Sequence, residues 1–204
     1  MQISQQLGKE FEVLKYFYKN RMGHVRQIKR SVKISEHTLL KYLSKLEAIK
    51  VINHKAVGNL KIYSIDLEND LSKLLFSIFD FERLEGTEYN RKMGIKDFLE
   101  ALKVIKIPYF VMLFGSTAKD NYTKESDVDM LIVYDVYNKE LLDEVNKIKR
   151  RIVAERGVRI NFILIKIEEF LKEKSNKINY ALQDALITGY PIFGNQTYYE
   201  VIEK

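Results

Sequence analysis

Four residues between positions 110 and 134 have the types and the spacing to act on a phosphate-bearing molecule. Gly115 and Ser116 end one apolar run, and Asp127 and Asp129 begin the next. Side chains at i and i+2 on a strand point to the same face of a sheet, so the two carboxylates can hold a divalent metal together. A Gly-Ser turn offers backbone N–H groups and a hydroxyl to phosphate. The pattern indicates metal-assisted chemistry on a nucleotide.

The elements that must position these residues alternate along the chain. Apolar runs predict strands over 109–114, 127–134 and 158–165. Helical spacing of apolar residues predicts helices over 96–106, 139–156, 167–174 and 179–188. Such alternation predicts a small α/β domain with a mixed sheet and helices packed against it.

The order strand, Gly-Ser, spacer, Asp-x-Asp, strand resembles the polymerase-β-like nucleotidyltransferase superfamily, specifically its minimal members, over about residues 95–195. Ten residues separate Ser116 from Asp127. The resemblance implies that Asp127 and Asp129 bind Mg²⁺ (or Mn²⁺) and are catalytic. It further implies that Gly115 and Ser116 bind a nucleoside triphosphate (NTP), whose NMP passes to a hydroxyl on a protein or a nucleic acid.

Three neighbouring features complete the resemblance. Lys119 stands where many relatives have Arg, which implies a further positive charge for the phosphates, and Asp120 replaces a usual Gly. The C-terminal segment ALITGYPIFGNQTYYE is similar to the tail of these proteins, where a helix leads into a Gly-hydrophobic-Gly turn.

The third metal-binding carboxylate of active family members has no counterpart in the matching strand, 158–163. Its inward polar residue is Asn161, whose amide oxygen could bind a metal but cannot act as a base. Asp135 and Glu155 are alternative acids, although each lies at the end of an element. Nucleotide binding is therefore better supported by the sequence than turnover.

The N-terminal third holds all of the excess positive charge. Up to Asp66 there are thirteen Lys/Arg and five Asp/Glu, a net +8, whereas the remaining 21 basic and 23 acidic residues give −2. This asymmetry indicates a module that binds a polyanion.

The same segment resembles the winged helix-turn-helix family over about residues 7–66, by its order of elements. Helices are predicted near 7–19, 25–31 and 35–50, with Ser35 as the N-cap of the third, and two strands at 51–56 and 60–65 follow. The resemblance implies DNA binding by the third helix and the wing. The candidate DNA contacts are Thr38, Lys41, Ser44, Lys45, Lys55 and Lys61.

Composition excludes several other classes. The chain has 204 residues and no cysteine, so a disulfide framework or thiolate metal site is excluded, and its three histidines are too dispersed to predict zinc. No apolar run approaches the ~20 residues of a membrane span, and no signal-peptide core begins the sequence. We therefore expect a cytoplasmic protein with no membrane partner.

We expect an α+β protein with a winged helix-turn-helix DNA-binding domain (1–67), a connecting helix (68–94) and a minimal nucleotidyltransferase-like domain (95–204). The connecting helix could form a homodimer interface or pack within one chain. The leading hypothesis is a DNA-binding protein with a metal-dependent nucleotidyltransferase domain. The alternative is a transcriptional regulator whose degenerate domain senses nucleotide or binds a partner protein.

Overall fold

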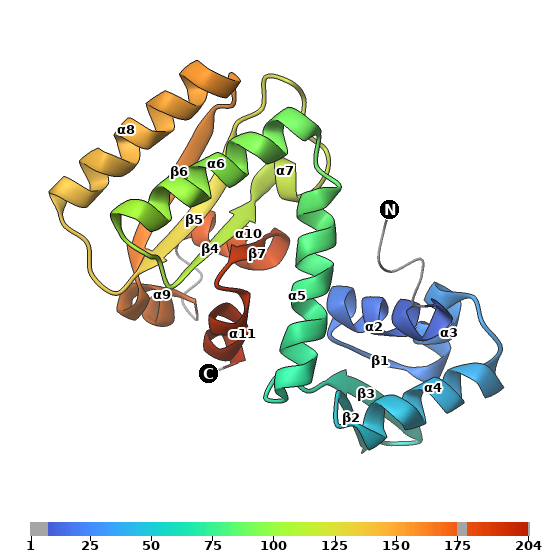
Figure 1. The fold of residues 1–204 in the computed structure, drawn as a ribbon. Coiled ribbons are helices and arrows are strands. Elements are labelled where there is room, and N and C mark those ends of the chain that lie inside the picture. The colour runs from blue at the N-terminus through green and yellow to red at the C-terminus, as the bar shows by residue number, and fades with distance from the viewer. Residues whose placement is uncertain (1–7, 175–178, 204) are drawn as a thin grey trace. The chain divides into compact units, whose positions relative to one another are not determined.

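The structure is a computed structural model that describes residues 8–174 and 179–203. It divides the chain into two compact units, one reaching to Glu82 and the other running from Arg83. Figure 1 shows helices and a small sheet in the first unit and a larger sheet between helices in the second.

The first unit has the element order of a winged helix-turn-helix domain. Its elements are α2 (Gly8–Asn20), β1 (Met22–His24), α3 (Val25–Val32), α4 (Glu36–Ala48), β2 (Ile52–Val57), β3 (Leu60–Ile65) and α5 (Asp70–Glu85), the last of which continues into the second unit. The three strands form an antiparallel sheet in the order β1-β3-β2. The predicted fold of this region is thus confirmed.

Capping and packing explain these helices. The Ser35 hydroxyl accepts a hydrogen bond from the Thr38 backbone N–H at 3.1 Å, which confirms the predicted N-cap of α4. The apolar stripes of α2 and α4 are buried, as the spacing of their leucines and aromatic residues requires. On α5, Phe79 packs on Phe11 with ring centroids 4.6 Å apart, so this face serves the core of the first unit.

The second unit is built around a four-stranded mixed sheet in the order β6-β5-β4-β7. Its elements are α6 (Tyr89–Ile105), β4 (Phe110–Phe114), α7 (Gly115–Ala118), β5 (Val128–Tyr134), α8 (Lys139–Arg156), β6 (Ile160–Lys166), α9 (Ile167–Glu173), α10 (Tyr180–Thr188), β7 (Tyr190–Phe193) and α11 (Asn195–Glu203). β5 pairs with β6 in parallel, and β4 pairs with β5 and β7 antiparallel. The mixed sheet is confirmed.

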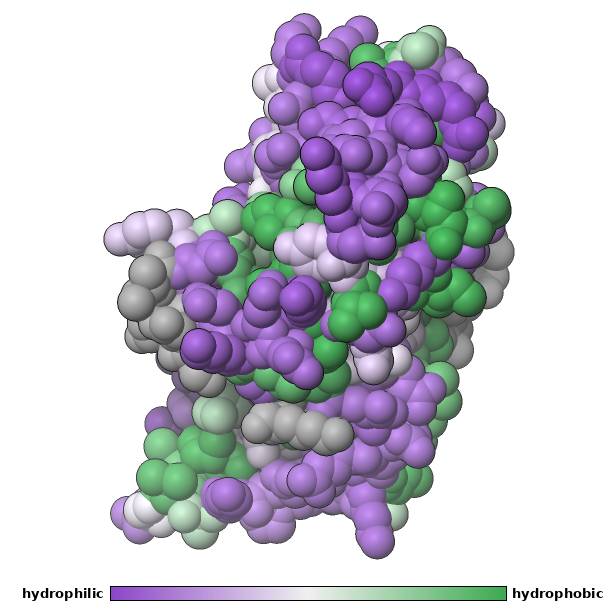
Figure 2. All heavy atoms as spheres, turned by 90° about the vertical axis from the view of Figure 1, so that its left-hand side faces the viewer, coloured by the Kyte–Doolittle hydropathy of each residue, from purple (hydrophilic) through white to green (hydrophobic). Residues whose placement is uncertain are grey.

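Helices cover both faces of this sheet (Figure 1). α6 and α8 pack on one face, where alternate residues of β5 such as Met130 and Ile132 enter the main apolar core. On the other face Phe110 contacts Phe170 of α9 and Tyr198 of α11. The outer surface of α8 is hydrophilic, and purple side chains dominate Figure 2 where this helix faces the viewer.

Several boundaries differ from the sequence predictions. The segment 68–94 is not one helix, because α5 ends at Glu85 and α6 begins at Tyr89. α6 starts seven residues before the predicted Lys96, since the Glu88 carboxylate caps its first N–H groups. β1 was not predicted, and the segment expected to form a turn after α10 is strand β7.

None of the helices in the described part of the chain combines the length and the apolar character that crossing a membrane requires.

Candidate functional site

The predicted chemistry-bearing residues meet at one end of the second sheet. Antiparallel pairing sets Phe114, the last residue of β4, opposite Asp129 of β5. Gly115 follows with φ +69°, and a Cβ there would lie 3.2 Å from Cγ of Asp129 and closer still to its carboxylate oxygen. The turn after β4 therefore requires glycine at position 115, because the Asp129 carboxylate occupies the space that a side chain would need.

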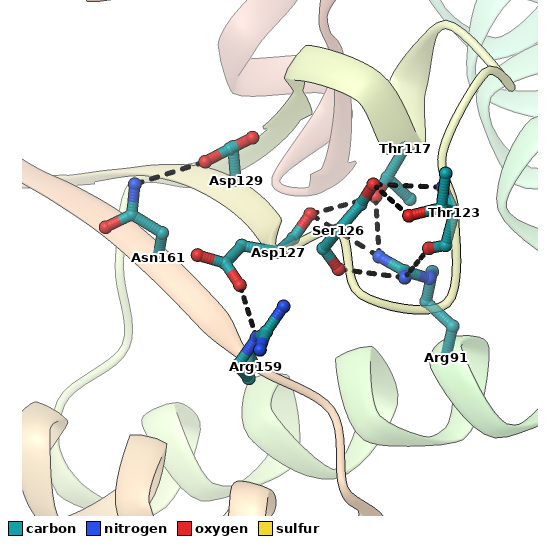
Figure 3. A network of polar contacts seen from close by, with 8 residues as sticks. All are labelled: Arg91, Thr117, Thr123, Ser126, Asp127, Asp129, Arg159 and Asn161. Carbon is teal, nitrogen blue, oxygen red and sulfur yellow. Dashed lines mark hydrogen bonds and ion pairs between the residues drawn. The ribbon is translucent and has the colours of Figure 1, made fainter.

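The parallel strand β6 brings two more polar side chains to the carboxylates. Asn161 pairs with Asp129 in the register, and its Nδ2 donates to Asp129 Oδ1 at 3.1 Å. Two residues earlier, Arg159 Nε donates to Asp127 Oδ1 at 2.7 Å. Figure 3 shows Asn161 on β6 and Arg159 just before this strand, each joined to its aspartate. Each aspartate thus has a donor from the neighbouring strand.

The side chains at this end of the sheet provide only part of the ligand set of one hard divalent cation. Asp127 and Asp129 supply carboxylate oxygens, and Asn161 can add its amide oxygen, the ligand types that Mg²⁺ takes in proteins. Among residues 8–174 and 179–203, no group of three His, Cys, Asp or Glu side chains could hold a metal ion. Asp135 lies beyond the opposite end of β5 and pairs with Lys106 at 2.6 Å, so it does not replace the missing carboxylate. A bound cation would have to take its other ligands from substrate phosphates and water.

Ser116 and Lys119 lie at the two ends of the short helix α7. Ser116 is half-buried next to Gly115. Lys119 is exposed and its Nζ lies 3.1 Å from Asp184 of α10. Its charge is therefore already paired, which makes it a weaker candidate for phosphate binding than Ser116.

Arg91 is a site residue that sequence reasoning missed. It comes from α6, is only 6% exposed, and donates to the Thr117 hydroxyl at 3.0 Å. It also donates to three backbone carbonyls of the loop before β5, those of Thr123 (3.0 Å), Ser126 (2.9 Å) and Asp127 (3.4 Å). Figure 3 shows this guanidinium beneath the loop that leads to Asp127. Arg91 fixes the path of the chain between the glycine turn and the carboxylates.

Glu88 supports Arg91 at the start of the same helix. Its carboxylate accepts from the backbone N–H groups of Asn90 and Arg91 at 3.0 and 2.9 Å, and these bonds lower the pKa of Glu88 below 4.5. The Arg91 guanidinium in turn lies 4.4 Å from the ring centre of Tyr122. No local sequence pattern signals Arg91, because its partners follow it by 26 to 36 residues.

A pocket of about 520 Å³ opens beside this network. Its lining residues come from the start of α6, the loop before β5 and the segment before β6: Glu88, Asn90, Arg91, Tyr122, Thr123, Lys124, Glu125, Ser126, Gly157, Val158 and Arg159. Arg159 is common to the pocket and to the ion pair with Asp127. The pocket therefore reaches the predicted metal-binding end of the sheet.

In the first unit, the candidate DNA contacts lie on α4 and on the two wing strands. Lys41, Ser44, Lys45 and Lys55 are exposed. Thr38 is engaged at the N-cap, where its hydroxyl lies 2.8 Å from that of Ser35.

Two of the lysines in this set have acidic neighbours. Lys45 pairs with Glu10 at 3.3 Å, and Lys61 on β3 lies 3.8 Å from Glu47. Both pairs are on the surface, where such pairs contribute little free energy and exchange readily.

Comparison with known proteins bears on the second unit. The nucleotidyltransferase domain family matches residues 93–185. A protein of Methanocaldococcus jannaschii, named as a candidate protein adenylyltransferase, is 39% identical over 93 residues, which is 43% of this chain and 84% of that protein.

Two solved structures were also found at low similarity. A candidate nucleotidyltransferase from Sulfolobus solfataricus is 20% identical, covers 44% of this chain and 82% of its own, and has a TM-score of 0.23. The archaeal chromatin protein TrmBL2 is 17% identical, covers 84% of this chain and 70% of its own, and has a TM-score of 0.27. Both TM-scores are too low to support an inference. The identity and coverage of the Methanocaldococcus relative, together with the glycine turn and the paired aspartates, show that the chain belongs to the nucleotidyltransferase domain family.

Proposed function

We propose that the second unit binds an NTP with Mg²⁺ and transfers its NMP to a hydroxyl acceptor. The observation that carries this proposal is the strand register, which pairs Phe114 with Asp129 and Asp129 with Asn161. Because of this register, the glycine turn and the two carboxylates share one end of the sheet. A structural domain would have no need of this combination.

The residues have separate roles in the proposed reaction. Gly115 and Ser116 would hold the triphosphate, and Asp127 and Asp129 would hold the metal. When bound, Mg²⁺ neutralises phosphate charge and favours the attacking form of the hydroxyl. The acceptor oxygen forms a bond to the α-phosphorus, the bond from that phosphorus to the bridging oxygen breaks, and pyrophosphate leaves with the electron pair. The hydroxyl proton passes to solvent, since Asn161 cannot accept it.

The Methanocaldococcus relative favours ATP as the nucleotide and a protein as the acceptor, because it is named as a protein adenylyltransferase. The test is transfer of label from each α-labelled NTP to protein, in the presence of Mg²⁺ and a lysate from the source cells. We expect labelled protein with ATP, and none with Asp127→Asn. Label transfer that survives this change would refute the metal site.

We further propose that the first unit binds DNA through α4 and the wing. The net charge of +8 up to Asp66 and the exposed lysines of α4 support this, since phosphate contacts by Lys and Arg provide most non-specific DNA affinity. A mobility-shift titration of the full chain with duplex DNA tests it. Absence of salt-sensitive binding would refute it.

One observation favours the alternative of a degenerate, nucleotide-sensing regulator. β6 and the residue before it offer the two aspartates an amide and a guanidinium rather than a carboxylate. The variant Asn161→Asp distinguishes a slow nucleotidyltransferase from a nucleotide-sensing regulator. If the domain is an enzyme, the added carboxylate should raise its rate of label transfer. If neither the native chain nor this variant transfers label while both bind ATP, the regulatory function stands.

A further inference from the structure

The charged side chains that line the pocket beside Arg91 fall into two groups. Some are already held by hydrogen bonds within the protein, and others are not. The Arg91 guanidinium is engaged by the loop carbonyls and the Glu88 carboxylate by the α6 N–H groups. By contrast, the Lys124 ammonium, the Glu125 carboxylate and both Nη groups of Arg159 have no hydrogen-bond partner within residues 8–174 and 179–203. The Lys124 and Glu125 side chains and the two Nη groups of Arg159 can therefore contact a ligand, while the Nε of Arg159 stays paired with Asp127.

Arg159 connects this pocket to the carboxylate that would hold the metal. Its Nε lies 2.7 Å from Asp127 Oδ1, and its side chain is 55% exposed. A cation held by Asp127 would compete with the guanidinium for that carboxylate. The positive charge of Arg159 would then be uncompensated at the pocket.

We propose that this pocket binds the acceptor, as an acidic peptide segment that carries the reactive hydroxyl, and that Arg159 holds one of its carboxylates. The inference rests on the proposed transfer reaction, whose bond changes it leaves unaltered. Arg159 would act as a specificity residue, since it contacts the acceptor next to the reacting group. Because Arg159 is released only when Asp127 is engaged, acceptor binding would be coupled to metal binding.

The charges of the pocket favour a peptide over a nucleic acid acceptor. Its lining has three basic and two acidic side chains, a net charge of 3 − 2 = +1 (Arg91, Lys124 and Arg159 against Glu88 and Glu125). That balance suits a short segment with one or two carboxylates better than a backbone that carries a phosphate at every residue. A volume of about 520 Å³ is within the range of ordinary ligand pockets and can accommodate a side chain with its flanking residues.

Asp127→Asn offers a test that needs neither metal nor catalysis, because it removes the charge that compensates Arg159. The probes are Ac-Asp-Ser-Asp-NH2, its neutral counterpart Ac-Asn-Ser-Asn-NH2 and a 5′-phosphorylated dinucleotide, titrated into the full chain without Mg²⁺ and followed by NMR. We expect the acidic peptide to bind Asp127→Asn at least ~5-fold more tightly than the native chain. The gain should vanish in Asp127→Asn/Arg159→Gln and be absent with the neutral peptide.

Three results would overturn the proposal: no gain in Asp127→Asn, an equal gain in the double variant, or a larger gain for the dinucleotide than for the acidic peptide. A second measurement tests the proposal without Asp127→Asn, in case that variant fails to fold. Mg²⁺ should raise the affinity of the native chain for the acidic peptide but not that of Arg159→Gln; an equal rise would show that the peptide binds the metal directly. Since no experiment here uses an NTP, failure of label transfer would leave these results interpretable.

Discussion

The carboxylate end of the second unit and the α4 face of the first unit differ in how firmly their side chains are held. Asp129 accepts a hydrogen bond from Asn161 of β6 and Asp127 one from Arg159 just before that strand, and Arg91 fixes the loop before them. The side chains of Lys41 and Ser44 of α4, in contrast, are exposed and make no hydrogen bonds among the described residues. Metal and phosphate chemistry needs fixed geometry, whereas phosphate contacts to DNA can be made by mobile lysines.

The largest expected effect comes from removing Arg91, the residue that holds the loop before β5. Arg91→Met removes the guanidinium that donates to the Thr117 hydroxyl and to three loop carbonyls. The Thr123 carbonyl keeps a bond from the Ser126 N–H and the Asp127 carbonyl one from the Thr117 hydroxyl, whereas Ser126 loses its donor. We expect the free energy of unfolding of the second unit to fall by roughly 3 kcal/mol, because buried acceptors lose charge-assisted hydrogen bonds. Urea denaturation, with hydrogen exchange of the β5 amides to assign the transition, measures it.

Arg159→Met is the matched control, since it removes a second arginine from the same end of the sheet. Its single ion pair is about half exposed, so the loss should stay below ~1 kcal/mol. Equal losses in the two variants would show that Arg91 has no special part in fixing the loop.

The glycine turn provides a sharper test of fixed geometry. In Gly115→Ala the new Cβ would collide with the Asp129 carboxylate, so we expect at least ~10-fold weaker binding of ATP with Mg²⁺, or about 1.4 kcal/mol. Gly157→Ala is the control, because Gly157 has a similar φ of +67° but a Cβ there would meet no described atom within 4 Å. If both variants lose the same affinity, backbone strain rather than the Asp129 contact is responsible.

On the α4 face, the prediction concerns charge rather than geometry. Lys41→Glu/Lys45→Glu should weaken DNA binding and reduce the slope of log affinity against log salt by about 2, as expected for two lost phosphate contacts. Lys9→Glu/Lys19→Glu on α2 makes the same change of charge away from the proposed face. An unchanged slope in the α4 variant, or an equal change in the α2 variant, would refute this face.

The smallest expected effect is a pH dependence in the second unit. A hydrogen bond from Lys96 is the main cause of the lowered pKa of Glu85, and Lys92 adds to it. A lowered pKa stabilises the fold above the unfolded value of about 4.5, and this stabilisation is lost as the pH falls through the lower folded value. Glu85→Gln should therefore cost less than about 1 kcal/mol at neutral pH, with a difference from the native chain that shrinks below pH 4.5. A difference that grows in acid would contradict the assignment.

Local patterns were sufficient to predict most of the elements and the motif. The turn, the two aspartates and the position of Asn161 follow from strand alternation, a rule that involves adjacent residues only. The same rule applied to β6 would have found Arg159, because it lies two residues before Asn161 and so shares its face. α8 was predicted with its observed bounds, Lys139–Arg156, since Asn138 caps its start and Gly157 ends it in the left-handed conformation.

Contacts between distant segments were not predictable in this way. Arg91 acquires its role only when α6 packs beside the loop before β5. The start of α6 was missed because its cap is a glutamate, Glu88, rather than one of the usual capping residues. β1 has only three residues and too short a pattern to signal a strand, and its pairing with β3 depends on the tertiary fold.

Calorimetric titration of the full chain with ATP in Mg²⁺, repeated on Asp127→Asn/Asp129→Asn, tests the central claim most directly. We predict saturable, metal-dependent binding by the native chain and none by the double variant. Absence of ATP binding by the native chain, or equal binding by the two proteins, would contradict a nucleotide site at this end of the sheet.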